Sequence, residues 1–200
     1  MTFHLTVKKK RIIEKLIALP RYMEMPPFPC FMVDISSYKT DLIGDFLEVR
    51  PNHNWLMMAD YAALTNDQLW TAWLFSQRAF ATGRALARSL DTEFLRYIAG
   101  THHVSEAFKK VGVQKSHNKA WIVNLPNFEE KEGELYPIVD IKHSEEIVSM
   151  ISQKLGLLTI NSTPKITKHG LDKLGIDVAE IDDSVADIII GFIISSDINS

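Results

Sequence analysis

The chain has 200 residues, of which 46% are apolar, with one cysteine and a formal net charge of −3. This length suits a single domain, and the apolar fraction excludes a largely disordered chain. A single cysteine excludes an internal disulfide and a zinc site built from several thiolates, and the negative net charge argues against a dedicated basic DNA-binding domain.

Residues 1–29 are predicted to form an extension ahead of the domain. Val7–Leu19 has the spacing of a short basic amphipathic helix. A stiff linker follows, made by three prolines: Pro26, Pro27 and Pro29. The apolar part of the extension is short and contains charged residues, so it resembles neither a signal peptide nor a membrane span. We therefore expect a cytoplasmic protein with no membrane contact.

Residues 30–200 are predicted to form one domain in which strands and helices alternate. Short apolar and β-branched runs predict these strands: Cys30–Ile35, Trp55–Ala59, Ala120–Leu125, Leu157–Ile160 and Ile188–Ile194. Leu135–Ile141 is either an extension of the third strand or its hairpin partner. Asn127–Gly133, which lies between the two, is predicted to be an acidic loop.

Helices are predicted where apolar residues recur at helical spacing between capping residues. They are Lys39–Val49, Asn66–Leu90, Thr92–Ala99, Val104–Lys110, Ser144–Leu155 and Thr167–Leu174. Thr65 and Gln68 fit a capping box, and Gly83 bends or splits the long helix that follows. The fold class is therefore α/β in the mixed α+β sense, a single domain with a small mixed or antiparallel sheet and helices packed against it.

Motifs of catalysis and cofactor binding are absent from the sequence. It lacks the glycine-rich phosphate loops, the zinc-protease motif and the nucleophile elbow. Cys30 lies inside an apolar strand, where a thiol is inert packing, and Asp182-Asp183 suits a solvated turn before the final strand. His102 and His103 are adjacent, so we expect a polar helix start and not a metal site. We expect no catalytic residue, no metal, no cofactor and no small-molecule substrate.

Charge is distributed unevenly along the chain. Residues 1–120 carry 16 Lys and Arg against 11 Asp and Glu, whereas residues 121–200 carry 6 against 14. A chain with this asymmetry can present a basic face despite its net charge. Arg84 and Arg88 stand four residues apart after Gly83, and guanidinium groups bind phosphate oxygens bidentately. The i, i+3 spacing of Trp70 and Trp73, in contrast, indicates packing.

The stretch Phe94–Val113 has the order helix, glycine turn, helix. In a helix-turn-helix interpretation, Val104–Lys110 enters a major groove of DNA. This gives the alternative function, a DNA-binding regulator, although the short second helix and the acidic remainder of the chain oppose operator binding.

Taken with its surroundings, this stretch also resembles a known family. Ala85–Val113 has a helix with Glu-x-Leu, a turn of a small residue and glycine, a polar pair, and Ala-x-x-x-x-Gly followed by an aliphatic residue. These features are Glu93, Leu95, Ala99, Gly100, His102, His103, Val104, Ala107, Gly112 and Val113. The pattern resembles the kinase-binding subunit family of the KEOPS complex, whose archaeal members usually carry Arg-Gln in place of the two histidines. The resemblance covers residues 30–200 and excludes residues 1–29.

The resemblance implies a non-catalytic protein with two partners. Family members bind the N-terminal lobe of the small KEOPS kinase, and they hold the 3′ CCA end of tRNA while the complex modifies the adenosine at position 37 with a threonylcarbamoyl group. Our candidates for tRNA contact are Arg84, Arg88, His102, His103, Lys109 and Lys110. Our candidates for the kinase interface are Leu95, Ile98, Val104 and Phe108.

Overall fold

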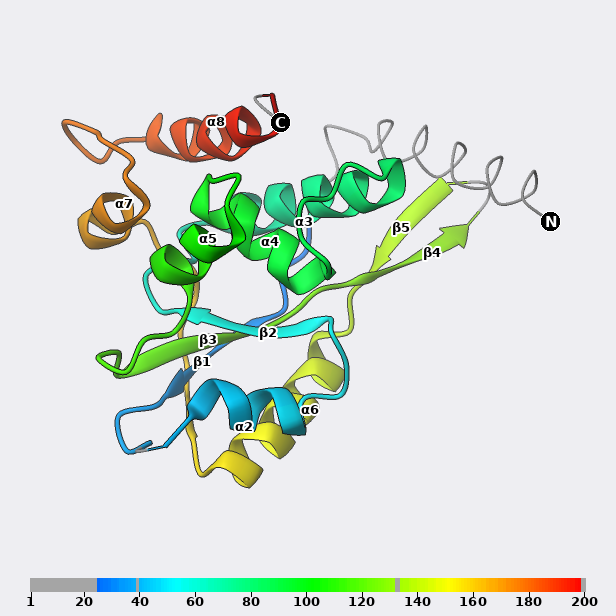
Figure 1. Ribbon diagram of the computed structural model, residues 1–200, viewed down its shortest axis with the longest axis vertical. Helices are drawn as coiled ribbons and strands as arrows, with labels where there is room; N and C mark the ends of the chain where they lie inside the picture. The colour runs from blue at the N-terminus through cyan, green and yellow to red at the C-terminus, as the bar shows by residue number, and fades with distance from the viewer. Residues whose placement is uncertain (1–24, 39, 132–133, 199–200) are drawn as a thin grey trace.

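The main sheet has four antiparallel strands in the order β2-β3-β1-β6. The computed structural model describes residues 25–38, 40–131 and 134–198 (Figure 1). The strands of this sheet are β1 (Cys30–Asp34), β2 (Trp55–Ala59), β3 (Lys119–Asn124) and β6 (Leu158–Ile160). A separate hairpin of β4 (Asn127–Lys131) and β5 (Glu134–Ile138) projects away from it (Figure 1).

Helices cover both faces of this sheet (Figure 1). On one face lie α2 (Leu42–Val49) and α6 (Ile141–Leu155). On the other lie α3 (Asn66–Thr82), α4 (Leu90–Ala99) and α5 (Val104–Val111), with α7 (Lys168–Leu174) beside α5. Helix α8 (Val185–Ile198) packs on the outer side of α3 and α4. The predicted fold class, a mixed α/β arrangement with an antiparallel sheet and helices packed against it, is confirmed. Among the described helices, none has both the length and the apolar character needed to cross a membrane.

Alternation along β3 divides the apolar core into two clusters. Trp121 and Val123 belong to the cluster beneath α3, α4 and α8, whereas Ala120 and Ile122 belong to the cluster beneath α2 and α6. Successive side chains of a strand point to opposite faces, so a strand with helices on both sides is apolar at nearly every position. This explains why continuous apolar runs predicted β1, β2 and β3 correctly.

The long helix begins and ends at residues that the sequence marks. The Thr65 side chain accepts a hydrogen bond from the Gln68 backbone, and the two residues form the predicted capping box. Gly83 takes the left-handed conformation, with φ 75°, and ends the helix at Thr82. Trp70 and Trp73 are 5% and 1% exposed, which confirms that they are packing residues.

The prediction of a final strand over Ile188–Ile194 is wrong, because this segment lies within helix α8. Val185, Ile189 and Ile193 recur every fourth residue and are almost completely buried where α8 packs on α3 and α4. The preference of β-branched residues for strands contributes less free energy than the burial of these three side chains. Packing against α3 and α4 therefore determines that the segment is helical.

The prediction of an acidic loop over Asn127–Gly133 is also wrong in part. Asn127–Lys131 forms strand β4, which pairs with β5 in a register that runs from Asn127 opposite Ile138. Residues 135–138 therefore pair with β4 and neither extend β3 nor pair with it, and Ile141 already belongs to α6.

The helix predicted over Val7–Leu19 lies outside the described residues. The proline segment that follows it packs onto the domain: Phe28 is 4% exposed, and its ring centroid lies 4.8 Å from that of Trp70. The Trp70 indole N–H donates to the Pro26 carbonyl at 2.8 Å. The predicted linker is thus anchored to α3 over its last residues.

An ion pair joins the two helical layers beside β2. Arg50 follows α2, and its Nη1 donates to the Trp55 carbonyl at 2.7 Å and to Asp91 Oδ2, in the first turn of α4, at 2.5 Å. Both charged side chains are only 10% exposed. The contact therefore connects α2 on one face of the sheet to α4 on the other.

Candidate nucleic-acid interface

Arg84 and Arg88 do not lie on a helix. Because α3 ends at Thr82 and α4 begins at Leu90, the segment between them is irregular, so the two arginines are not one helical turn apart. Both are exposed, and Arg84 Nε donates to Thr82 Oγ1 at 3.3 Å. The helical-spacing argument for a phosphate-binding pair is therefore wrong, although both guanidinium groups are near the surface.

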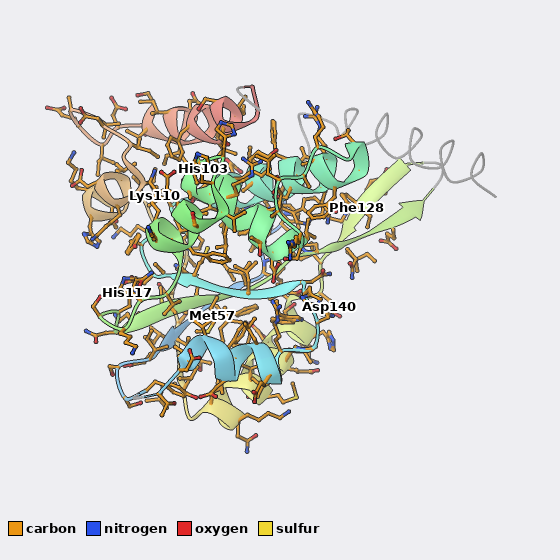
Figure 2. All side chains as sticks on the ribbon, viewed as in Figure 1. Met57, His103, Lys110, His117, Phe128 and Asp140 are labelled. Carbon is orange, nitrogen blue, oxygen red and sulfur yellow. The ribbon has the colours of Figure 1, made fainter. Side chains whose placement is uncertain are left out.

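The six predicted tRNA contacts fall into two groups at opposite ends of α4. Arg84 and Arg88 precede this helix, whereas the other four follow it. A ten-residue helix spans about 15 Å. His103 is the N-cap of α5 and is exposed, as is Lys109 in the last turn. Figure 2 shows His103 and Lys110 on the same side of the molecule.

Lys110 has a structural role within the domain. Its ammonium group donates to the Ala99 carbonyl, at the C-terminal end of α4, at 3.0 Å, and lies 5.2 Å from the centroid of the Phe192 ring. Burial lowers the pKa of this lysine. A cation at the end of a helix stabilises its unpaired carbonyls, so Lys110 joins α5, α4 and α8.

Two of the four kinase-interface candidates are core residues. Leu95 is 5% exposed and Ile98 is completely buried in the cluster under α8. Val104 is half-buried, and Phe108 on α5 is 45% exposed. The surface available to a protein partner is therefore that of Val104 and Phe108.

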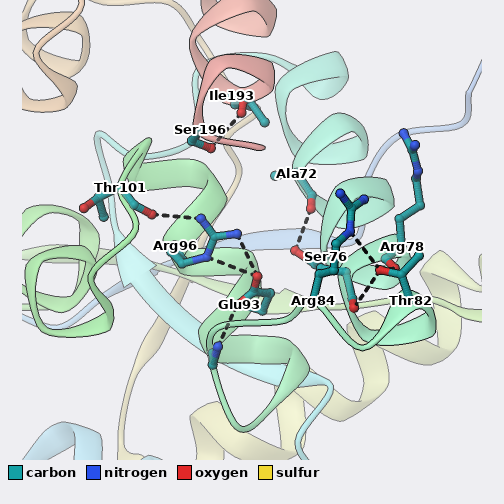
Figure 3. Close-up of polar contacts among 12 residues, drawn as sticks. Ala72, Ser76, Arg78, Thr82, Arg84, Glu93, Arg96, Thr101, Ile193 and Ser196 are labelled. Carbon is teal, nitrogen blue, oxygen red and sulfur yellow. Dashed lines mark hydrogen bonds and ion pairs between the residues drawn. The ribbon is translucent and has the colours of Figure 1, made fainter. Parts of the chain in front are cut away.

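A buried ion pair, missed at the level of sequence, organises both ends of α4 (Figure 3). Arg96 Nη2 donates to Glu93 Oε1 at 2.7 Å, and Arg96 Nη1 donates to the Thr101 carbonyl at 3.0 Å. The second Glu93 oxygen accepts from the Ala87 backbone N–H at 2.8 Å. Both charged side chains are at most 1% exposed. Glu93, the glutamate of the Glu-x-Leu motif, thus binds the segment before α4 directly and the turn after α4 through Arg96.

A polar pocket of about 400 Å³, here called the Tyr61 pocket, lies beside the basic end of α5. Its lining comes from the end of β2, the loop before β3, and α7. The lining residues are Asp60, Tyr61, Ser116, His117, Asn118, Lys119, His169 and Lys173. No sequence candidate for tRNA contact lines this pocket, although Lys119 belongs to the basic part of the chain.

Sheet register and one close approach bring these residues together. β2 and β3 are antiparallel, with Ala59 opposite Ala120, so Asp60 and Lys119 lie at the same end of the strand pair. α7 approaches through Gly170, where an added Cβ would lie 2.8 Å from the Tyr61 carbonyl oxygen. Only glycine permits this approach. The close approach also places His169, the residue before Gly170, against the Tyr61 ring.

Tyr61 is the aromatic residue among those that line the pocket. Its hydroxyl donates to the Lys110 carbonyl at 2.9 Å, and burial raises its pKa. His117 and His169 meet its ring edge to face, with centroid distances of 5.5 and 5.4 Å. Lys173 Nζ lies 5.9 Å from the ring centroid. In Figure 2, His117 lies at the same end of the molecule as Lys110.

Burial is the main reason that the pKa of His117 is lowered from 6.5; Lys173 and His169 add to the lowering and Asp60 opposes it. At neutral pH this imidazole is therefore uncharged. The lining of the pocket also includes two lysines and one aspartate, so cationic side chains lie near a carboxylate acceptor. Such a site attracts an anionic ligand that also carries hydrogen-bond donors.

The remaining predicted sites have structural explanations. Burial raises the pKa of the Cys30 thiol to about 12, so the thiol is protonated and unreactive. Asp182 is exposed and accepts from the Ser184 hydroxyl at 2.6 Å, which confirms a solvated turn, here before a helix. In the part of the chain that the structure describes, no group of three His, Cys, Asp or Glu side chains is placed to hold a metal ion.

Comparison of the chain with protein-family models and with curated proteins found no match. The interpretation of the site therefore depends on its geometry and on the motifs of Ala85–Val113.

Proposed function

We propose that the chain is a non-catalytic, cytoplasmic subunit of a KEOPS complex, which binds the N-terminal lobe of the complex's kinase and the 3′ CCA end of tRNA. The observation that carries the proposal is the Tyr61 pocket, which is lined by two lysines, two histidines and an aromatic ring at the basic end of α5. Together with the motifs of Ala85–Val113, this chemistry favours an RNA end as the ligand.

Single-stranded RNA is recognised by phosphate contacts and by aromatic and imidazole rings against the bases. A binder of this kind needs only a local cationic surface, so a formal net charge of −3 is compatible with it. Arg84 and Arg88, at the far end of α4, supply a second cationic surface. Because Arg84 and Arg88 precede α4 and do not line the Tyr61 pocket, the two surfaces contact different parts of the tRNA.

The kinase contact is proposed for the exposed part of α5. Phe108 is one of the few large apolar side chains of the described chain with nearly half of its surface exposed, at 45%. Aromatic residues are enriched at the centres of protein interfaces, where their burial contributes most to affinity. We therefore assign Phe108 to the kinase interface, with Val104 beside it on the same helix.

A titration of labelled tRNA tests the RNA part of the proposal. Removal of the three CCA nucleotides is expected to weaken binding about tenfold or more, since each base held against a ring contributes about 1–3 kcal/mol. Arg84→Glu/Arg88→Glu is expected to weaken binding and to make it less sensitive to salt. The matched control is Lys142→Glu/Lys154→Glu, which makes the same charge change at exposed positions on α6. Equal affinity for intact and truncated tRNA would exclude the CCA end as the ligand.

A pull-down with the kinase tests the protein part. Phe108→Ser is expected to lose the kinase while the Arg84→Glu/Arg88→Glu variant retains it. Retention of the kinase by Phe108→Ser, or failure of the unaltered chain to bind it, would contradict the assignment.

The alternative function, a DNA-binding regulator that uses Phe94–Val113, stays a prediction. Helix, glycine turn and helix are present as α4, Gly100 and α5. A duplex DNA arm in the same titration separates the two functions, because a regulator retains specific duplexes and the proposed subunit prefers tRNA.

A further inference from the structure

The main sheet has one covered edge and one open edge. Strand β2 forms the first edge, and all five of its residues are buried. Two of its carbonyls have donors outside the sheet: Arg50 Nη1 donates to the Trp55 carbonyl at 2.7 Å, and the Ala62 N–H donates to the Ala59 carbonyl at 3.0 Å. Strand β6 forms the second edge, and none of the described strands pairs with its outer side.

The open edge at β6 carries no charge. β6 spans Leu158–Ile160, and residues 155–164 include no charged side chain. Leu158 is 72% exposed, the highest value among the large apolar side chains of the described chain. Proteins protect exposed strand edges with charged residues or proline, and β6 has neither. Its composition is therefore that of an edge which another strand covers.

We propose that β6 pairs with β6 of a second copy of this chain. The two strands run antiparallel about a two-fold axis at Thr159, which joins the two four-stranded sheets into one. In such an interface each contact occurs twice, and assembly stops at the dimer. The inference goes beyond the proposed function and does not depend on it, because it uses neither the Tyr61 pocket nor α5.

Hydrogen bonds at the two ends of β1 show which of its residues face each neighbouring strand. The Ile35 N–H donates to the Asn118 carbonyl at 2.8 Å, and the Asn124 N–H donates to the Pro29 carbonyl at 2.9 Å. Backbone groups alternate in direction along an antiparallel strand. The odd-numbered residues of β1 therefore face β3, and its even-numbered residues face β6.

The same alternation leaves the backbone of Thr159 at the open edge. Leu158 and Ile160 lie opposite even-numbered residues of β1, so their N–H and C=O groups point to β1. Those of Thr159 and Asn161 point outward. With the two-fold axis at Thr159, the two copies of this residue exchange N–H···O=C hydrogen bonds, and each Asn161 N–H lies opposite the Leu157 carbonyl of the other copy.

On the face towards α3 and α4, this pairing sets apolar side chains opposite each other. Within one chain, Leu158 lies opposite Asp34, so its neighbour across the strand pair is a carboxylate. Ile160 lies opposite Met32, which in turn lies opposite Trp121 of β3. The two-fold axis places Leu158 of one copy opposite Ile160 of the other. The exposed leucine thus extends the apolar row that begins at Trp121 into the second chain.

On the face towards α6, the edge leaves room for a second strand. A hollow of about 480 Å³ adjoins it, and its lining includes Ser149, Thr159, Asn161 and Ser162. These side chains are small and polar. A neighbouring strand lies about 4.8 Å away, and side chains of this size admit it.

Sedimentation equilibrium of the full chain tests the proposal. Because the paired strands are short, the interface belongs to the small class, and we expect a reversible monomer–dimer equilibrium between about 5 and about 500 μM. Leu158→Lys puts a charge on the edge and is expected to weaken dimerisation about tenfold or more. Leu86→Lys, at a residue that is 49% exposed before α4, is the matched control and retains the dimer.

A proline variant tests the backbone pairing separately from the side chains. Because the Thr159 N–H points away from β1, proline at this position removes no hydrogen bond within the chain. Thr159→Pro is therefore expected to keep the circular dichroism spectrum of the unaltered chain and to lose the dimer. Thr159→Val, which retains the N–H, is expected to keep the dimer.

Cysteine variants treated with oxidised glutathione test the register. A disulfide needs Cα atoms about 4.4–6.8 Å apart. The two copies of residue 159 are expected to lie about 5.5 Å apart and those of residue 161 about 14 Å apart. Thr159→Cys is therefore expected to form a disulfide-linked dimer and Asn161→Cys is not. The Cys30 thiol, whose pKa is raised to about 12 by burial, stays protonated and does not compete.

Three results overturn the proposal: a monomer at every concentration, a species larger than the dimer, or equal crosslinking of the two cysteine variants. If the unaltered chain is monomeric and Leu158→Lys loses the kinase in the pull-down, β6 pairs with another protein and the homodimer is excluded. If Leu158→Lys and Leu86→Lys dissociate the dimer equally, the interface lies elsewhere than β6.

Discussion

Replacement of Gly100 by alanine tests how the C-terminal helix α8 is held. Gly100 follows α4 in the left-handed conformation, with φ 61°, and the Phe192 ring of α8 covers it so closely that a Cβ at this position would overlap the ring. The change therefore adds two penalties, one in the backbone and one in the packing of α8. Gly156, which ends α6 with φ 66°, supplies the matched control because a Cβ there meets no atom within 4 Å.

The expected magnitudes follow from these two environments. A left-handed conformation costs a non-glycine residue about 1–2 kcal/mol, which is the full expected loss for Gly156→Ala. Overpacking costs about 1–3 kcal/mol more, so Gly100→Ala is expected to lower the free energy of unfolding by about 2–5 kcal/mol. In the Gly100→Ala/Phe192→Ala double variant the overlap is absent, so the two losses are expected to be less than additive.

Urea unfolding followed by circular dichroism measures these losses, with the slope of the transition checked for each variant. Equal losses for Gly100→Ala and Gly156→Ala would refute the packing of Phe192 on Gly100. Strict additivity in the double variant would refute it as well.

The buried ion pair and the half-buried His117 give two further predictions. Glu93→Ala leaves the Arg96 charge buried without its partner, so we expect a loss of about 3–5 kcal/mol in urea unfolding; Glu93→Leu/Arg96→Met should lose less, and an equal loss in both would contradict a charge effect. The pKa of His117 is lower in the folded chain than its usual 6.5, so the unfolded chain binds more protons and stability falls as the pH drops below about 6.5. His117→Asn is expected to make the free energy of unfolding less dependent on pH in this range. An unchanged dependence would show that the folded chain does not lower the pKa of His117.

Local signals were sufficient for most elements of the fold. β1 to β3 are apolar because both of their faces are covered, and Thr65, Gly83 and Gly100 mark helix ends through their own conformational preferences. Helix α8 could not be predicted in this way. Its β-branched run favours a strand locally, and the helix is selected by the fit of every fourth side chain against α3 and α4.

The candidate site was less predictable than the fold. Arg84 and Arg88 were placed on one helix face because the sequence left open whether Gly83 bends or ends the helix. Leu95 and Ile98 were candidates for an interface because helical spacing identifies an apolar face without saying what covers it. The Tyr61 pocket unites three segments far apart in the chain, and no spacing pattern reports such a meeting.

The Arg50–Asp91 ion pair has a consequence for how the domain opens. Because it crosses from α2 to α4, the layer beneath the sheet cannot detach without leaving a charged group of the upper layer unpaired in a site that is only 10% exposed. Partial unfolding of either layer therefore carries the penalty of an unpaired, poorly hydrated charge. The two helical layers are consequently expected to open together, as one cooperative unit across the sheet.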